Sequence, residues 1–294
     1  MEYKLIGQTI KQIRQRKKIT QKALAQGICT QAQISKIENG EVIPLSITLY
    51  EIAKKLGVDI NYFFEVSTSP RSDYINETKT IIREAIDNID YQTVYEVVSS
   101  EEKNPLFHEL EDRQFLLWHK GIALYHLKNK YEESLELLYK ALHLRDERSK
   151  TLYSKTEVEI FNSIGVIFLE KENYAASIPI FNEGLHHLSK LNLPENDFIE
   201  VRLRYNLSRA YTETQRYDES NKHCERAISL CLSRETMYLL GELFYRVGEN
   251  YLGLENKERA KEYVIKSKKI FEVQEKEYLL SIIEEEMSDL LSEQ

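Results

Sequence analysis

Apolar residues recur every three or four positions along almost the whole chain, which is the period of an amphipathic α-helix. Only 10 Gly and 5 Pro occur among 294 residues, so few positions interrupt this pattern. The pattern predicts an all-α protein. Its first part, residues 1–65, predicts five short helices, and a different rhythm runs through residues 76–294.

Two threonines and two glycines punctuate the segment after the first predicted helix. Thr20 and Thr30 each precede a short helical pattern, and Gly27 and Gly40 end these patterns. A threonine side chain accepts a hydrogen bond from the first turn of a helix, and glycine adopts the left-handed backbone that commonly ends one. The spacing therefore predicts two short helices joined by a tight turn, which is a helix-turn-helix.

Charge is distributed unevenly. The formal net charge is −8, yet residues 1–36 contain eight Lys or Arg and one Glu. A basic end on an acidic body indicates a segment that meets a polyanion. A cationic membrane helix is the alternative, but the segment lacks a Trp- or Phe-rich apolar face. The chain shows neither a run of about 18 apolar residues nor a signal peptide, so we expect a cytoplasmic protein with no membrane partner.

The segment TQKALAQGICTQAQISKIENGEVIPLSITLYEIAKKLGV resembles the phage-repressor or Xre type of DNA-binding domain. The positions that carry the resemblance are Gln21, Ala25, Ile34, Ile37, Glu38, Asn39, Gly40, Pro44 and the turn 53–56. The resemblance implies that the second helix of the motif lies in the major groove of DNA. It also implies an internal pair between Arg14 and Glu38.

Side-chain chemistry then selects residues for DNA contact. A glutamine amide can pair with an adenine edge, an alanine can touch a thymine methyl, and a lysine can donate to guanine. We expect Gln21 and Asn39, at the two ends of the motif, to bind phosphate. The alternative is that these polar residues form only a solvated helix face. The predicted groove contacts are Gln31, Ala32, Gln33, Ser35 and Lys36.

After a linker predicted at residues 66–75, where Ser, Thr and Pro cluster, the sequence repeats itself. Positions recur 43 residues apart in four sets: Tyr131, Tyr174 and Tyr217; Ser134, Ser177 and Ser220; Leu138, Phe181 and Cys224; Ala141, Gly184 and Ala227. A further unit follows after 40 residues, and a weaker one starts near Tyr91. The order of small and aromatic positions resembles the tetratricopeptide repeat. We expect about five helical hairpins and a final capping helix, EYLLSIIEEEMSDLL.

Stacked hairpins of this kind form a right-handed superhelix whose concave wall is lined by the first helix of each hairpin. An asparagine on that wall supplies a donor and an acceptor to a peptide backbone, a cation can hold a carboxylate, and tyrosine adds contact area. The predicted peptide-binding residues are Lys120, Asn162, Arg202, Tyr205, Asn206, Arg209, Glu242 and Tyr245. The same register also places further residues on this inner wall: His119, Ala123, Glu159, Ser163, Val166, Arg246 and Glu249.

The whole chain resembles the PlcR-like regulators of Gram-positive bacteria, in the group that also holds Rap, NprR and PrgX, and RYNLSRAYTETQRYDES is its most family-like repeat segment. The resemblance implies a homodimeric transcription regulator that binds double-stranded DNA at a palindromic operator. It implies that the repeat groove takes a short, re-imported signalling peptide, as in quorum sensing. The alternative is a DNA-bound adaptor whose repeats recruit a protein partner.

Other chemistry is not expected. The seven histidines show no HExxH or CxxC spacing, and the sequence has no glycine-rich phosphate loop and no nucleophile elbow. We therefore expect no enzyme activity, no metal and no cofactor. The three cysteines, Cys29, Cys224 and Cys231, form no paired framework, and we expect them to be buried small hydrophobic residues.

Overall fold

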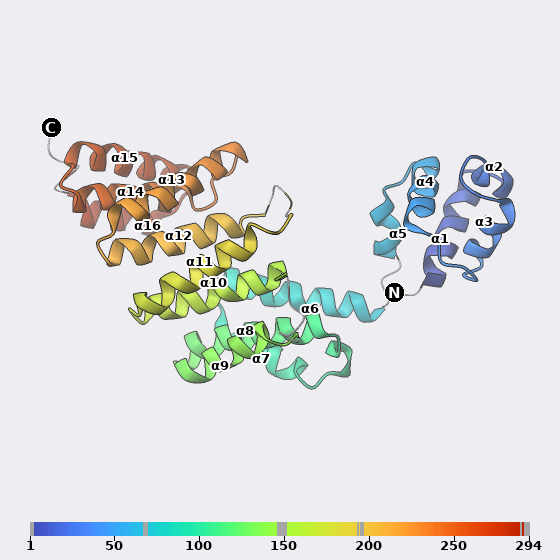
Figure 1. The fold of residues 1–294 in the computed structure, drawn as a ribbon, viewed down its shortest axis with the longest axis horizontal. Helices are drawn as coiled ribbons and strands as arrows, with labels where there is room; N and C mark the ends of the chain where they lie inside the picture. The colour runs from blue at the N-terminus through green and yellow to red at the C-terminus, as the bar shows by residue number, and fades with distance from the viewer. Residues whose placement is uncertain are drawn as a thin grey trace. The chain divides into compact units, whose positions relative to one another are not determined.

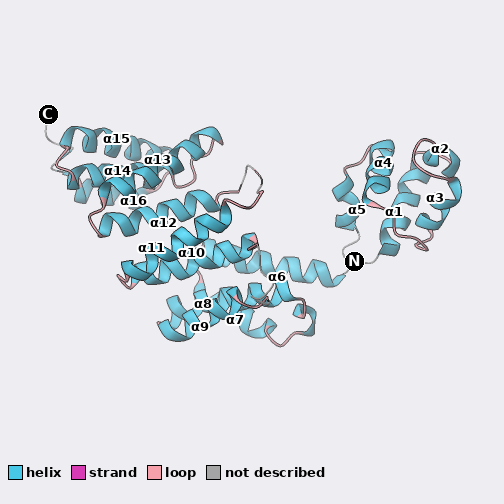
Figure 2. Ribbon diagram, in the orientation of Figure 1, coloured by secondary structure: helices cyan, strands magenta, loops and turns pink. Residues whose placement is uncertain are grey.

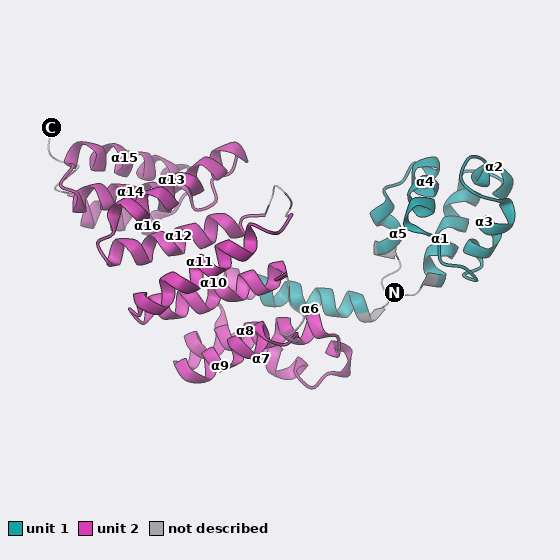
Figure 3. Ribbon diagram, in the orientation of Figure 1, with its two compact units in different colours: residues 1–84 teal, residues 85–294 magenta. Residues whose placement is uncertain are grey.

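The structure is a computed structural model, and it describes residues 3–66, 70–145, 152–192, 194, 197–288 and 290. Its described residues form helices and connecting loops, with no strand among them (Figures 1 and 2). The chain divides into two compact units, Met1–Glu84 and Ala85–Gln294 (Figure 3). The all-α class predicted from the sequence is confirmed. None of the described helices has the length and apolar character needed to cross a bilayer.

The first unit contains the five short helices predicted for residues 1–65. They are α1 (Tyr3–Arg16), α2 (Gln21–Ala25), α3 (Gln31–Glu38), α4 (Ser46–Leu56) and α5 (Ile60–Val66). The Thr20 hydroxyl oxygen accepts a hydrogen bond from the backbone N–H of Ala23 at 3.1 Å, and the Thr30 hydroxyl oxygen accepts one from Gln33 at 3.2 Å. These are the two predicted N-caps, and they set where α2 and α3 begin.

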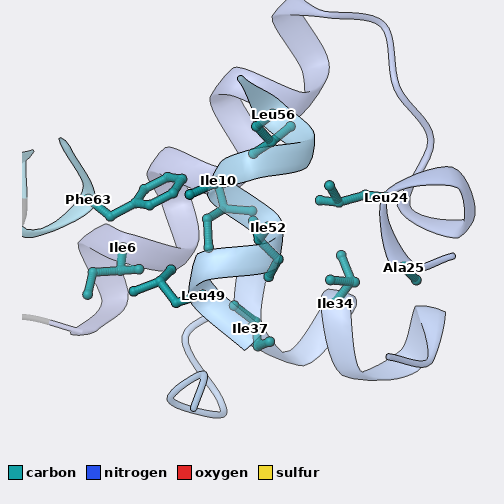
Figure 4. Packing of buried hydrophobic residues seen from close by; sticks show 11 residues of the cluster. Ile6, Ile10, Leu24, Ala25, Ile34, Ile37, Leu49, Ile52, Leu56 and Phe63 are labelled. Atoms are coloured by element: carbon teal, nitrogen blue, oxygen red, sulfur yellow. The ribbon is translucent and has the colours of Figure 1, made fainter. Parts of the chain in front are cut away.

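Apolar side chains from all five helices meet in one core. Figure 4 shows Ile10 of α1 and Ile52 of α4 among them, with Leu24 of α2 and Ile34 of α3 on the other side of the cluster. All four of these side chains are fully buried. Burial of this stripe on α3 leaves the opposite face of the helix at the surface, so the core orients the predicted recognition helix.

Helix α6 (Pro70–Asp87) spans the boundary between the two units. Residues 70–75 are therefore helical rather than the irregular connection that their Ser/Thr/Pro content suggests, and residues 67–69 lie outside the described residues. Proline is well tolerated in the first position of a helix because the N–H it lacks has no partner there. The end of the first domain and the extent of a linker remain predictions.

The second unit is a series of helical hairpins, which follow one another in Figure 1 from green to red. The pairs are α8 (Leu110–Lys128) with α9 (Tyr131–Leu142), α10 (Lys155–Glu170) with α11 (Tyr174–Leu188), α12 (Ile199–Glu213) with α13 (Tyr217–Ser233), and α14 (Leu240–Gly253) with α15 (Lys257–Val273). Before them, α7 (Tyr91–Glu101) packs against α8, and the short 3-10 helix η1 (Pro105–Phe107) joins the two. The predicted final helix is α16 (Glu277–Glu286), which packs against α15.

A repeated hydrogen bond explains the 43-residue rhythm. In three successive hairpins a fully buried serine of the second helix donates to a backbone carbonyl of the first. The pairs are Ser134 to Gly121 at 2.7 Å, Ser177 to Gly165 at 2.9 Å, and Ser220 to Ser208 at 2.9 Å. A serine hydroxyl reaches the backbone of the facing helix only when the two helices approach closely, which the small residues at these positions allow.

The aromatic position of the register depends on the same closeness. A Cβ atom added to Gly165 would lie 2.5 Å from the ring of Phe181, which is fully buried against α10. The ring thus packs directly on the helix backbone. The burial of Leu138 and Cys224, one period before and after Phe181, confirms the register.

The cysteines are all free thiols. Cys224 and Cys231 are buried as expected, whereas Cys29 is only partly buried at the edge of the first core.

Candidate DNA-binding face and peptide groove

A buried ion pair holds α1 against α3. The Arg14 guanidinium donates to both carboxylate oxygens of Glu38, at 2.6 and 2.8 Å, and to the backbone oxygen of Ile19 at 2.8 Å. Burial by itself would raise the pKa of Glu38, but the hydrogen bonds from Arg14 and Gln21 and the charge of Arg14 hold that pKa below its usual value. The pairing implied by the family resemblance is confirmed, and Arg14 is a structural residue.

The side chain of Gln21 links this ion pair to the recognition helix. Its amide nitrogen donates to Glu38 at 2.9 Å, and its amide oxygen accepts from the Gln31 side chain at 3.3 Å. Gln21 thereby orients Gln31, which is exposed at the start of α3. The phosphate contact predicted for Gln21 remains a prediction.

Helix α3 presents one polar face. Its exposed side chains are Gln31, Ala32, Gln33 and Lys36, and Ser35 is partly exposed beside them. Asn39 follows the helix as its C-terminal cap, is exposed, and donates to Glu41 at 3.1 Å. All the predicted groove contacts therefore lie on one side of a short helix whose other side is core, the arrangement that groove insertion requires.

Sequence reasoning missed the apolar surface that follows α3. Leu45 and Ile47 are 75% and 76% exposed, and Ile43 and Tyr50 are also exposed. The signal was present in the sequence, since Ile47 and Tyr50 lie off the stripe of Leu49 and Ile52 that fills the core.

In the repeat domain, the two asparagines predicted to bind a peptide lie side by side. The Asn206 amide nitrogen on α12 donates to the Asn162 amide oxygen on α10 at 2.9 Å, and the residues are only 6% and 7% exposed. This bond leaves the Asn162 amide nitrogen as a donor and the Asn206 amide oxygen as an acceptor. The pair therefore offers the hydrogen-bond donor and the hydrogen-bond acceptor that a peptide backbone needs, from adjacent repeats.

Two arginines of the repeat domain, one on α12 and one on α14, are paired with carboxylates. Arg202 bonds Glu159 at 3.1 Å, and Arg246 bonds Glu249 at 2.5 Å. Arg209 lies over the Tyr205 ring, 5.9 Å from its centroid. Yet the buried Nε atoms of Arg202 and Arg246 find no hydrogen-bond partner within the described part of the chain.

Three further predicted residues converge on a single pocket of about 150 Å³. Tyr205 on α12 and Glu242 and Tyr245 on α14 line it together with Arg246. The remaining wall comes from Phe271 of α15 and from Leu279, Ile282 and Ile283 of α16. The sequence predicted α16 only as a cap, although the apolar stripe in EYLLSIIEEE could have indicated that its face meets another surface.

The first repeat differs from the prediction. His119 and Ala123, expected on the inner wall, are 3% and 0% exposed, and a His119 ring nitrogen lies 2.8 Å from the backbone oxygen of Phe115. Both positions therefore lie in the packed interior and not on the inner wall. Lys120 pairs with Glu102 at 2.5 Å and lines a cavity of about 110 Å³ between α7, α8 and α9.

A polar recognition helix on one unit, and a stack of hairpins with paired asparagines on the other, define a helix-turn-helix protein with a tetratricopeptide-like C-terminal domain. The chain belongs to the RNPP family. The model of the RNPP family C-terminal domain matches residues 79–292, and a helix-turn-helix model matches residues 10–63. The PlcR-like resemblance stated from the sequence is thereby confirmed.

Solved structures resemble the chain over its length. Bacillus thuringiensis PlcR in complex with the peptide PapR7 and DNA is 28% identical, with a TM-score of 0.77, over 99% of this chain and 100% of that one. The apo form of PlcR gives 27% identity and a TM-score of 0.66, over 98% and 99% of the two chains. The SHP pheromone receptor Rgg2 of Streptococcus dysgalactiae, at 16% identity and a TM-score of 0.65 over 97% and 99%, shares the fold.

Among curated proteins, Protein HGV2 of Halocynthia roretzi is 34% identical over 143 residues, which are 49% of this chain. The chain spans only 26% of the length of that relative.

Proposed function

We propose that this chain is a sequence-specific DNA-binding transcription regulator controlled by a short signalling peptide that binds the concave side of its repeat domain. The observation that carries the proposal is the bonded pair of Asn162 and Asn206, which presents one donor and one acceptor from adjacent repeats. PlcR, which is similar over its whole length, has been crystallised with a peptide and DNA together.

On the DNA side, α3 enters the major groove. Gln31, Gln33 and Lys36 read base edges, and Ala32 and Ser35 fill the space between them. Gln21 and Asn39 hold the phosphates on either side. The internal pair of Arg14 and Glu38 keeps α3 at a constant angle to α1, so that these contacts form without reorganisation.

On the peptide side, the two asparagines bind the backbone, and Arg202 and Arg209 attract a carboxylate. Arg202 is well suited because its buried Nε atom has no hydrogen-bond partner among the residues that the structure describes, although Glu159 already neutralises part of its charge. Tyr205, Glu242 and Tyr245 hold side chains of the peptide, and Lys120 holds an acidic group at the far repeat.

The regulator works in the cytoplasm as a homodimer on a palindromic operator, and it is not an enzyme. The equivalent recognition helices of two copies must lie about 34 Å apart, or a multiple of that, to reach successive major grooves. Peptide binding changes the pitch of the repeats and thereby the spacing of the two DNA-binding domains. The peptide can shift this equilibrium only by binding one of the two states more tightly.

The experiment is a titration of DNA selected by the full chain from random duplexes, with and without heptapeptides selected by the chain from a synthetic library. We expect the selected peptides to change the DNA dissociation constant. Asn206→Ala should weaken peptide binding and leave basal DNA binding intact, while Asn182→Ala, an exposed asparagine on α11, should change neither. Unchanged DNA affinity with peptide bound would refute the switch. A chain that retains a large protein partner and no peptide would instead support the adaptor function, and an unfolded Asn206→Ala variant would assign Asn206 to the scaffold.

A further inference from the structure

The pocket between α12, α14, α15 and α16 has the character of an apolar side-chain site. Its lining includes the aromatic residues Tyr205, Tyr245 and Phe271 and the aliphatic residues Leu279, Ile282 and Ile283. Its volume is about 150 Å³. An apolar protein cavity of that size accommodates benzene, so the space matches one phenyl ring.

Two of the residues that line this pocket each have a buried polar atom without a hydrogen-bond partner among the described residues. These atoms are the Oε2 atom of Glu242 and the Nε atom of Arg246. Their positions are four residues apart on α14, so both side chains lie on one face of the helix. One of these atoms is an acceptor and the other a donor. A buried polar atom without a partner costs free energy that a ligand recovers when it supplies the missing bond.

The rest of each side chain is already held. Lys276 donates to the other carboxylate oxygen of Glu242 at 2.8 Å, and Glu249 accepts from a terminal nitrogen of Arg246 at 2.5 Å. The partnerless atoms are therefore fixed in direction before any ligand arrives. Each charge also has an opposite charge beside it, so the pocket offers little net attraction to a charged side chain.

An amino-acid residue in an extended peptide fits this arrangement. Its N–H and C=O point to the same side of the backbone, as in a hydrogen-bonded pair of a β-ladder. The N–H would donate to Glu242 and the C=O would accept from Arg246. Its side chain would then meet the rings of Tyr205, Tyr245 and Phe271, which favour an aromatic partner in edge-to-face contact.

We propose that this pocket is the specificity site of the repeat domain, which selects a peptide with an aromatic residue at one position and binds the backbone of that residue through Glu242 and Arg246. The proposal rests on the function proposed above and adds the class of side chain that the groove selects. Because α16 supplies one wall, and because Glu286 of α16 accepts a hydrogen bond from Tyr245, an occupied pocket also secures the C-terminal helix.

The test is a selection of random synthetic heptapeptides on the full-length protein, read by sequencing the retained peptides with mass spectrometry. We expect enrichment of Phe, Tyr or Trp at one position. Ile282→Trp fills the pocket from its partly exposed wall and should abolish the enrichment. Ile265→Trp, at an exposed position of α15 outside the pocket, should leave it unchanged. Aromatic enrichment that persists in Ile282→Trp, or no aromatic preference in the wild type, would overturn the proposal.

The backbone contacts are tested with Arg246→Lys, which keeps the charge beside Glu249 and removes the Nε donor. We expect an aromatic heptapeptide from the selection to bind about tenfold more weakly, the factor typical of one charge-assisted hydrogen bond, with its aromatic preference intact. Unchanged affinity would remove Arg246 from the site. If the wild-type protein retains no heptapeptide at all, the proposed function fails; if it retains peptides of any side-chain class equally, only this inference fails.

Discussion

Removal of Arg14 isolates the internal ion pair that supports the DNA-binding face. Arg14→Met keeps most of the side-chain volume and deletes the charge and its donors. Glu38, which is 2% exposed, would then stay buried. Of the side chains that bond it among the described residues, Gln21 at 2.9 Å would remain. The loss of one partner from a buried ion pair costs about 3–5 kcal/mol, because the other charge remains without compensation.

Such a cost is a large share of the stability of a small domain. Each 1.4 kcal/mol is a factor of ten in an equilibrium constant, so amides of α3 should exchange with deuterium at least about 100-fold faster at neutral pH. The measurement is hydrogen–deuterium exchange of the full chain, followed by mass spectrometry of peptides from α1 and α3. Arg16→Met, at an exposed position of the same helix, is the matched control and should change little.

The sign of the pH dependence gives a second check. In the wild type the pKa of Glu38 lies below its usual value of 4.5, so the contribution of the pair is fully present above that value and is lost as the pH falls through the lowered pKa. In Arg14→Met, burial raises the pKa of Glu38, and the cost is relieved as the pH falls through the raised value. The gap between variant and wild type should therefore narrow on acidification.

A double variant, Arg14→Met with Glu38→Leu, removes both charges and should recover most of the lost protection. Exchange of α3 that stays at the wild-type rate in Arg14→Met at neutral pH would refute the reasoning. So would a double variant that is no more protected than the single one.

Three further outcomes follow from the described contacts. Gly165→Val places a side chain where even a Cβ atom would lie 2.5 Å from the Phe181 ring. Calorimetry should show that the free energy of unfolding falls by about 1–3 kcal/mol, and Phe181→Leu in the same chain should restore part of it. Burial, and then the charge of Arg204, lower the pKa of His223 from 6.5 to about 4. The contribution of the neutral imidazole to stability is therefore present above pH 6.5 and is lost as the pH falls toward 4. His223→Gln should flatten the dependence of the melting temperature on pH over this window, and an unchanged dependence would contradict the assignment. Lys36→Gln should weaken DNA binding, measured by titration at several salt concentrations. If Lys36 contacts phosphate instead of a base, the slope of log affinity against log salt concentration should also become about one unit shallower.

The parts of the fold that depend on near neighbours could be predicted from the sequence. Thr20 and Thr30 cap their helices because the bond closes within three residues, and it needs nothing from the rest of the chain. The hairpins could be predicted because each repeat solves the same packing problem, with a serine such as Ser177 facing a small residue such as Gly165. Periodicity makes a long-range contact visible in the sequence.

The candidate sites were only partly predictable, because the partner of a polar group depends on which helices meet. The repeat register brought Asn162 and Asn206 to the same wall, but it could not show that they bond each other. It also turned His119 toward the groove, whereas the structure buries that side chain at 3% exposure. The angle between two helices decides which side chains become buried between them. One register shared by all repeats carries no information on that angle.

By itself, then, the sequence determined the helices, their caps, the two kinds of domain and the side chains available to each surface. Only the tertiary structure decided that Arg246 would be paired yet keep one buried donor, and that α16 would supply Ile282 to the same pocket. The reason is physical. Helix formation and capping act over a few residues along the chain, whereas a pocket exists only where several helices, distant in sequence, stop short of filling the space between them.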